Sequence, residues 1–203
     1  MVVIHYTAME TADAACTRLC DAAAEVSAHY LISGQGKTTQ LVPEDMRAWH
    51  AGAGAWGDVT DVNSHSIGIE LANTGSTPFA AAQMDALEAL LADIQGRRAI
   101  PAARVIGHSD MAPARKFDPG PRFDWRRLAL GRFSVWPEDV QAVDGTWADF
   151  LTYANTFGYR CDDKDAVLSA FRLRFWPLKT STLDAVDIGT MKRLSDCWPC
   201  AAK

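Results

Sequence analysis

The sequence predicts an α/β fold with a mixed central sheet flanked by helices, followed by a small all-α domain of three helices. Strand-like and helix-like segments alternate up to about residue 130, a pattern typical of an α/β domain built around one sheet. Residues 133–145 carry Pro137 and little periodicity, and three short helical patterns follow them. Of the 203 residues, 48% are hydrophobic and 22% are charged, which fits a folded chain and argues against disorder.

The elements of the first part follow from the spacing of apolar residues and from turn signals. Two β-rich runs lie on either side of the segment 34–37, whose glycines indicate a hairpin. The segment 49–63 is rich in glycine and is expected to be a loop. We expect strands at residues 2–6, 27–33, 38–42, 66–71 and 101–106, and helices at residues 10–25, 79–98 and 125–130.

Three helical patterns fill the last part of the chain. In the middle one Val167, Phe171 and Phe175 share one face, and Asp162 or Asp163 can cap its start. About 58 residues are enough for a small helical domain. The three helices are expected at residues 146–157, 163–175 and 187–197.

Composition excludes several classes of function. A net charge of −5 without a polybasic run argues against nucleic-acid binding, and no apolar stretch is long enough for a transmembrane segment. An odd number of cysteines, five, does not indicate a disulfide framework, and the sequence leaves open whether Cys161, Cys197 and Cys200 form a disulfide. A redox role for Cys197 and Cys200 is disfavoured because no strand precedes the pair.

Two histidines and one aspartate are candidate metal ligands. His5 closes a predicted strand, His108 follows another, and Asp118 lies ten residues later on a proline-rich loop. Two imidazoles and one carboxylate form a known catalytic zinc set that leaves a fourth position for water. Taken alone, the three residues could equally be polar side chains with ordinary partners.

Six segments share both order and residue pattern with one family of enzymes. They lie at residues 3–8, 26–32, 48–52, 63–71, 106–110 and 115–125. They resemble the zinc-dependent N-acetylmuramoyl-L-alanine amidases of the amidase-2 (AmpD/AmiD) family.

The resemblance implies a role for five residues. His5, His108 and Asp118 match the ligands of one zinc ion per chain, Glu70 matches the family's catalytic glutamate, and Lys116 its catalytic lysine. The implied reaction is hydrolysis of the amide bond between N-acetylmuramic acid and L-alanine, in peptidoglycan or in an anhydro-muropeptide. The implied domains are a zinc amidase domain over 1–132, a linker over 133–145 and a helical peptidoglycan-binding-like domain over 146–203.

Elementary chemistry agrees with these roles. A zinc-bound water has a pKa of about 7, and Glu70, near the end of a predicted strand, can take its proton and return it to the leaving amine. Lys116 lies two residues from Asp118, so on extended backbone both side chains leave on one side and the ammonium can stabilise an oxyanion. The plainer alternatives are that Glu70 only orients a ligand and that Lys116 is a solvated charge.

Other polar and aromatic residues are weaker candidates. His50, Asn63 and Arg47 are expected at the substrate, although each also has a structural interpretation. His29 is expected to be a core histidine and His65 an exposed loop residue. Trp49 and Trp56 either wall the groove or pack in the core.

The helical segment adds a binding role to the hydrolase. Residues 157–177 and 187–190 resemble the peptidoglycan-binding domain found in AmiD-type amidases, whose tethering would raise the local substrate concentration on an insoluble polymer. We therefore expect a separable unit whose deletion spares cleavage. The alternative function is a non-catalytic peptidoglycan recognition module on the same fold.

Location and assembly are expected from what the chain contains. It shows no signal peptide and opens directly on a core strand, so we expect residues upstream of Met1 in the natural protein. A leader there would direct the protein to the cell envelope or periplasm, and without one it would be cytoplasmic. We expect a monomer.

Overall fold

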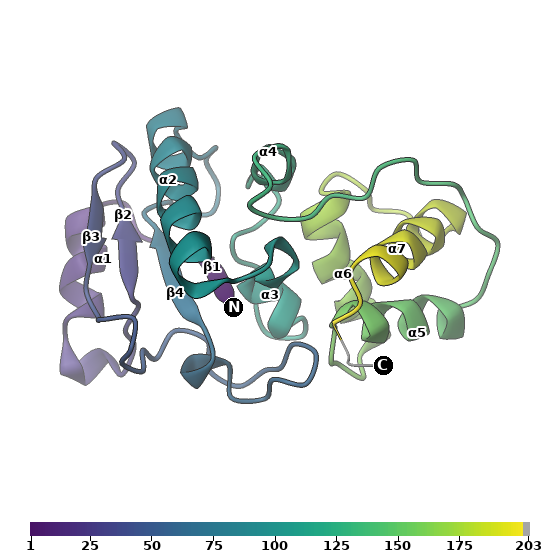
Figure 1. Ribbon diagram of the computed structural model, residues 1–203, viewed down its shortest axis with the longest axis horizontal. Coiled ribbons are helices and arrows are strands. Elements are labelled where there is room, and N and C mark those ends of the chain that lie inside the picture. The colour runs from purple at the N-terminus through teal and green to yellow at the C-terminus, as the bar shows by residue number, and fades with distance from the viewer. Residues whose placement is uncertain (201–203) are drawn as a thin grey trace.

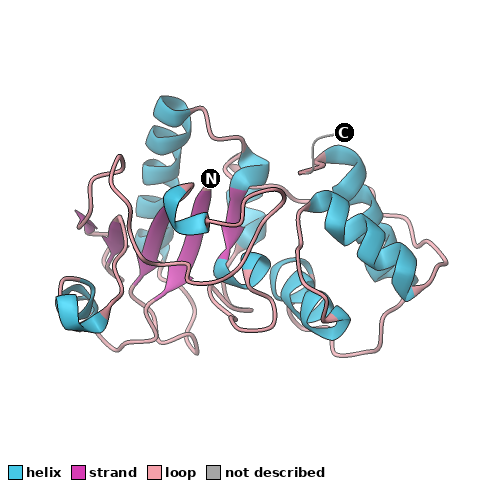
Figure 2. Cartoon of the chain, turned by 90° about the horizontal axis from the view of Figure 1, so that it is seen from below, coloured by secondary structure: helices cyan, strands magenta, loops and turns pink. Residues whose placement is uncertain are grey.

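The computed structural model describes residues 1–200 and contains a five-stranded sheet at its centre (Figures 1 and 2). The strand order is β3-β2-β4-β1-β5, with β3 antiparallel to β2 and all other neighbours parallel. This mixed sheet flanked by helices confirms the predicted fold class. The strands are β1 (Val2–Tyr6), β2 (Tyr30–Ile32), β3 (Thr38–Gln40), β4 (Ile67–Leu71) and β5 (Val105–Gly107).

Each face of the sheet carries its own hydrophobic core. On one face, Ile4 and Ile69 pack against Leu87 and Leu91 of α2 (Ala81–Arg98), together with α4 (Trp125–Leu130). Side chains alternate along a strand, so Val3, next to Ile4, points to the opposite core. That second core holds α3 (His108–Met111) and, as described below, the C-terminal helices.

The expected helix over 10–25 is wrong in its length. The structure has α1 (Ala12–Leu19), which is capped by Thr11, and a separate 3-10 turn (Ala22–Ala24). The carboxylate of Asp21 accepts a hydrogen bond from the Ala23 amide, and Glu25 adopts a left-handed conformation. Local hydrogen bonding by the aspartate therefore competes with helix continuation, although alanine favours it.

The C-terminal helices lie where the sequence places them. They are α5 (Trp147–Phe157), α6 (Lys164–Phe175) and α7 (Ala185–Cys197). Helix α7 begins two residues before the expected start because Asp184 caps its first turn. The last three residues of the expected domain over 146–203 lie outside the described residues.

The C-terminal helices share a core with the sheet. Phe157 and Phe171 belong to the same buried cluster as Val3 of β1, and α6 packs beside α3 (Figure 1). A β-bridge joins Trp56, in the loop over 49–63, to Tyr159, which follows α5. These contacts argue against the expectation of a separable unit.

Close backbone approach holds this bridge together. The Gly57 amide donates to the Gly158 carbonyl over 2.8 Å. Gly158 has φ of 146° and lies against the Trp56 indole, so a side chain there would be strained and would overlap the ring. Trp56 is therefore a core residue, which settles one of the alternatives left open by the sequence.

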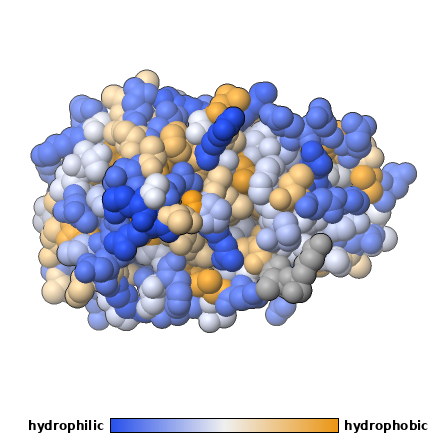
Figure 3. Space-filling model, in the orientation of Figure 1, coloured by the Kyte–Doolittle hydropathy of each residue, from blue (hydrophilic) through white to orange (hydrophobic). Residues whose placement is uncertain are grey.

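Most of the face seen in Figure 3 is polar, with apolar residues in small scattered groups. Within the described residues, no helix combines the length and apolar character needed to cross a membrane.

Candidate active site

The candidate site lies at the carboxyl ends of three neighbouring parallel strands. His5 of β1 is in register with Glu70 of β4. On the other side of β1, Ile4 is in register with Gly107 of β5, and His108 follows immediately at the start of α3. In α/β sheets this edge is where ligands bind.

The three expected metal ligands meet at one point. Nδ1 of His5 lies 2.9 Å from Nδ1 of His108 and 2.9 Å from Oδ2 of Asp118. The His108 Nδ1 atom lies 3.0 Å from the same carboxylate oxygen. All three residues are buried. The sequence-based expectation that these distant residues converge is therefore met.

Hydrogen bonds to the far ring nitrogens fix the tautomers of both histidines. Nε2 of His108 lies 2.8 Å from the Ala51 carbonyl, which can only accept, so Nε2 carries a proton and, in the neutral ring that a metal ligand requires, Nδ1 carries the lone pair. Nε2 of His5 lies 3.0 Å from Nδ1 of His50, whose own Nε2 faces the Ser66 hydroxyl.

The direction of that second chain follows from its last member. Ser66 donates to the Val62 carbonyl over 2.5 Å, so its oxygen accepts from His50 and His50 accepts from His5. Burial lowers the pKa of His5 to about 4 and the pKa of His50 well below its usual value, so both rings are neutral. His5 Nδ1 therefore also presents a lone pair.

The donor set fits a zinc ion. With Asp118 ionised and both rings neutral, three lone-pair-bearing atoms would face one another at 2.9–3.0 Å without a proton between them. That arrangement is repulsive unless a cation lies among them. In a tetrahedral zinc site, ligand bonds near 2.0–2.2 Å put neighbouring donors roughly 3.3–3.6 Å apart. The observed spacing is slightly smaller.

Glu70 is a partly buried residue next to this cluster. Its Oε2 atom is shielded from solvent and has no hydrogen-bond partner among the described residues. Burial, together with the charge of Asp118, raises the pKa of Glu70 well above its usual value, and Lys116 opposes this effect. A carboxyl group with a raised pKa and an unpaired oxygen is a candidate general acid and base.

Lys116 lies on the wall of the same cleft. The cleft has a volume of about 380 Å³, and His5, Glu70, Lys116 and Asp118 all line it. The positive charge of Lys116 is close enough to lower the pKa values of Glu70 and His5. The cleft therefore places a lysine charge near the candidate metal ligands.

The three residues expected at the substrate lie in different places. His50 lines the cleft, held against β4 because Gly68 has no side chain to displace its ring. Asn63 lies behind the cleft, where its Oδ1 accepts from the His50 and Ala51 amides at 3.0 and 2.8 Å. Arg47 does not line the cleft. Its guanidinium pairs with Asp61 at 2.6 Å and lies over the ring of Trp49.

Sequence reasoning missed several residues that shape the site. Ser66 and the Ala51 carbonyl fix the histidine tautomers, and no residue pattern indicates these contacts. Arg115 lines the cleft and donates to the Ala51 carbonyl over 2.8 Å. The position of Arg115 directly before Lys116 was the sequence feature that could have indicated its place in the cleft.

His29 accepts a hydrogen bond from the Gly68 amide and is buried, and His65 is exposed, both as expected.

The fold and the cleft together define an α/β protein with a buried His-His-Asp cluster that can hold a metal ion. Residues 1–121 match the Amidase_2 family, described as N-acetylmuramoyl-L-alanine amidase. The chain belongs to this family, which is generally zinc-dependent. The resemblance drawn from the six segments is thereby confirmed.

Two curated relatives place the chain within the family. It is 42% identical over 160 residues to N-acetylmuramoyl-L-alanine amidase AmiD of Escherichia coli, covering 71% of this chain and 56% of that protein. It is 47% identical over 103 residues to 1,6-anhydro-N-acetylmuramyl-L-alanine amidase AmpD of Enterobacter cloacae, covering 51% and 55%. The chain thus spans little more than half the length of these relatives.

Solved structures resemble almost the whole chain. AmiD from E. coli, in complex with anhydro-N-acetylmuramic acid-L-Ala-D-γ-Glu-L-Lys, superposes with a TM-score of 0.89 at 33% identity, covering 97% of this chain and 88% of that one. AmpDh3 from Pseudomonas aeruginosa, in complex with an anhydromuramic pentapeptide, gives 0.89 at 29% identity, covering 98% and 92%. This coverage extends over the C-terminal helices.

Proposed function

We propose that this chain is a zinc-dependent N-acetylmuramoyl-L-alanine amidase. It would hydrolyse the amide bond between N-acetylmuramic acid and the L-alanine of the stem peptide. The observation that carries the proposal is the convergence of two histidine lone pairs and one carboxylate beside Glu70, whose Oε2 is unpaired. Membership of the family and the amidase activities for which AmiD and AmpD are named support it.

His5, His108 and Asp118 would hold the zinc ion. Bound there, zinc supplies a Lewis acid and a water molecule that ionises near neutral pH. Glu70 would take a proton from the attacking water at its Oε2 atom and return it to the departing nitrogen of L-alanine. The ammonium of Lys116 stabilises the negative charge that develops on the carbonyl oxygen.

The substrate is expected to be a muropeptide. The solved AmiD and AmpDh3 complexes contain anhydromuramic peptides, and nearly all of this chain superposes on those proteins. We propose anhydro-muropeptides and peptidoglycan as substrate classes. The cleft, at about 380 Å³, is large enough for a few residues of such a ligand.

The test measures zinc and product in the same preparation. Purified protein is analysed for zinc by atomic absorption, and release of free peptide from an anhydro-muropeptide is followed with and without a chelator. We expect one zinc per chain and release that stops with chelator and returns with added zinc. Muropeptide binding without cleavage would instead favour the non-catalytic recognition module.

We further propose that the helices over 146–203 contact the wall polymer, as expected from the sequence. A pocket of about 510 Å³ on this region supports a binding role, with Trp147 and Lys164 at its edge. Lys164 is exposed and lies 4.2 Å from the centre of the ring of Trp147, which is half-buried, and such a pair is suited to sugar and carboxylate groups.

Surface variants test this role without removing a helix. Trp147→Ala with Lys164→Ala should weaken pelleting with insoluble sacculi and leave cleavage of a soluble muropeptide unchanged. Undiminished pelleting of the double variant would reject the binding role. Wall binding and catalysis are thus tested separately.

A further inference from the structure

Asp110 connects the metal-ligand helix to the C-terminal helices. It lies on α3 two residues after His108 and is 1% exposed. Its Oδ2 accepts from the Gly107 amide over 2.8 Å, which closes the first turn of α3. Its Oδ1 accepts from the hydroxyl of Tyr159 over 2.7 Å. A carboxylate buried this deeply needs a cation.

Arg174 of α6 supplies that cation. Its Nη1 donates to Asp110 Oδ2 over 2.8 Å, and both side chains are 1% exposed. Its Nη2 donates to the Val105 carbonyl of β5 over 3.2 Å and to the Ser134 hydroxyl over 3.0 Å. The guanidinium also lies 4.4 Å from the centre of the Trp125 ring.

These hydrogen bonds connect α6 to β5 and to the start of α3, the segment that carries the proposed metal ligand His108. Val105 begins β5, Gly107 ends it, and His108 comes next. The Ser109 amide, within the same turn, donates to the carbonyl of Asp118 over 2.9 Å. A shift of α3 would therefore move His108 and disturb Asp118 together.

From this geometry we propose that Arg174 is a positioning residue for the metal site. Acting through Asp110, it fixes α3 and thereby the place of His108 Nδ1, and Tyr159 assists from the same carboxylate. The C-terminal helices thus serve the chemistry directly, in addition to any contact with the wall. The inference rests on the proposed zinc site.

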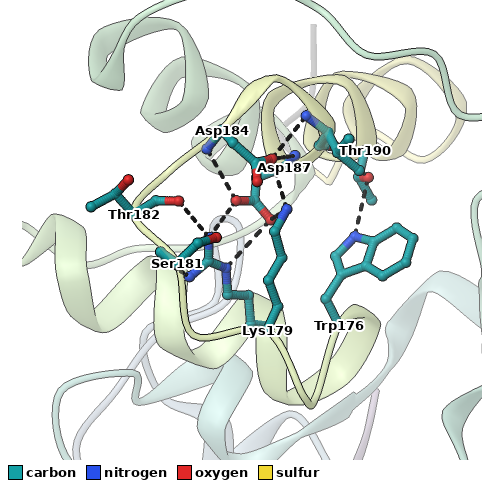
Figure 4. Close-up of polar contacts among 9 residues, drawn as sticks. Trp176, Lys179, Ser181, Thr182, Asp184, Asp187 and Thr190 are labelled. Atoms are coloured by element: carbon teal, nitrogen blue, oxygen red, sulfur yellow. Dashed lines mark hydrogen bonds and ion pairs between the residues drawn. The ribbon is translucent and has the colours of Figure 1, made fainter.

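The structure provides a matched control. Arg172, on the same helix, forms a second buried Arg–Asp pair with Asp187 at 2.5 Å, with side chains 9% and 0% exposed. Lys179 also pairs with Asp187, at 3.1 Å, as Figure 4 shows. This pair lies within the helical region, and among the described residues neither of its side chains hydrogen-bonds to α3. Loss of Arg172 should therefore destabilise the fold without moving His108.

The experiment uses the full chain and compares Arg174→Met with Arg172→Met. Zinc affinity is measured by competition with a fluorescent chelator, and thermal unfolding is followed with and without zinc. For Arg174→Met we expect the zinc dissociation constant to rise about 10-fold or more, the range seen when the outer partners of metal ligands are removed. For Arg172→Met we expect a lower melting temperature and wild-type zinc affinity.

Two milder variants keep the test decisive if Arg174→Met does not fold. Tyr159→Phe removes one hydrogen bond and keeps the ring, and it should weaken zinc binding by a few-fold. Arg174→Lys keeps the charge and should restore part of the affinity lost in Arg174→Met. Unchanged zinc affinity in Tyr159→Phe and Arg174→Lys, or an equal loss in Arg172→Met, would overturn the proposal. Absence of zinc binding by the wild-type chain would instead refute the metal site itself.

Discussion

His5 and Glu70 are paired residues on adjacent parallel strands, and both side chains leave the sheet on the same face. The backbone ladder between β1 and β4 therefore fixes the spacing of the proposed metal ligand and the proposed general base. Because both residues lie on strands, little rearrangement is needed to bring them together. The separation of their roles can be tested by changing one of them.

Replacing Glu70 by Gln should abolish turnover and leave zinc in place. Gln keeps the size of the side chain but cannot accept the proton, and the loss of a general base typically costs 10²–10⁴-fold in rate. Peptide release and zinc content are measured on the same sample. Loss of zinc from the Glu70→Gln protein would show that the residue supports the ligands instead.

Replacing Lys116 by Met should lower kcat by roughly 10²–10³-fold, the usual effect of losing one oxyanion donor. Zinc content should not change, because Lys116 is not among the three ligands. Steady-state kinetics on an anhydro-muropeptide give the kcat and KM values. Lys37→Met, at an exposed position that does not line the cleft, is the control. An unchanged kcat would leave Lys116 as a solvated charge.

Gly68→Ala should weaken zinc binding although Gly68 touches no metal ligand. A Cβ there would overlap the ring of His50, which accepts the hydrogen bond that fixes the His5 tautomer. We expect the zinc dissociation constant to rise about 10-fold, measured by chelator competition. His65→Gln, at an exposed position that does not line the cleft, is the control. Equal affinities in both variants would mean that His50 does not orient His5.

Glu44 makes part of the stability dependent on pH. Hydrogen bonds from Arg97 lower the pKa of Glu44 to about 2, and the Arg98 and Tyr30 side chains also donate to it. Because the folded-state pKa lies below the unfolded value, this stabilisation is complete above about pH 4.5 and is lost as pH falls toward 2. The effect amounts to about 1–3 kcal/mol.

Urea unfolding at pH 7 and at pH 3 measures this contribution. Glu44→Gln should be less stable than the wild-type chain at pH 7, and the difference should shrink at pH 3. Glu10→Gln, at an exposed position, serves as the control and should follow the wild-type curve. A constant difference between Glu44→Gln and wild type at both pH values would exclude the linkage.

Much of this architecture is readable from local pattern. The buried stripe of α2, the hairpin signal and the aspartate caps of α6 and α7 each specify an element within a few residues. The ligand set could be named because the flanking segments resemble a known family. The hydrogen bonds that fix the histidine tautomers could not be predicted from the sequence, because they involve Ser66 and the backbone carbonyl of Ala51.

Packing between segments that are far apart in the chain could not be predicted from the sequence, for a different reason. Arg174 reads as an ordinary charge on a helix, yet it is among the most buried residues of the chain. Only the docking of α6 onto α3 makes it so, and helix periodicity contains no information on what a face will meet. The expected linker over 133–145 likewise indicated a boundary but not the contacts made across it.

The bridge between Trp56 and Tyr159 has a consequence for how the chain melts. A buried aromatic cluster joins the sheet region to the C-terminal helices. Unfolding of either region would therefore expose the hydrophobic core of the other to solvent. Calorimetry should show one transition whose van't Hoff and calorimetric enthalpies agree. The two regions therefore unfold as one cooperative unit, and a substitution that destabilises either region lowers the stability of both.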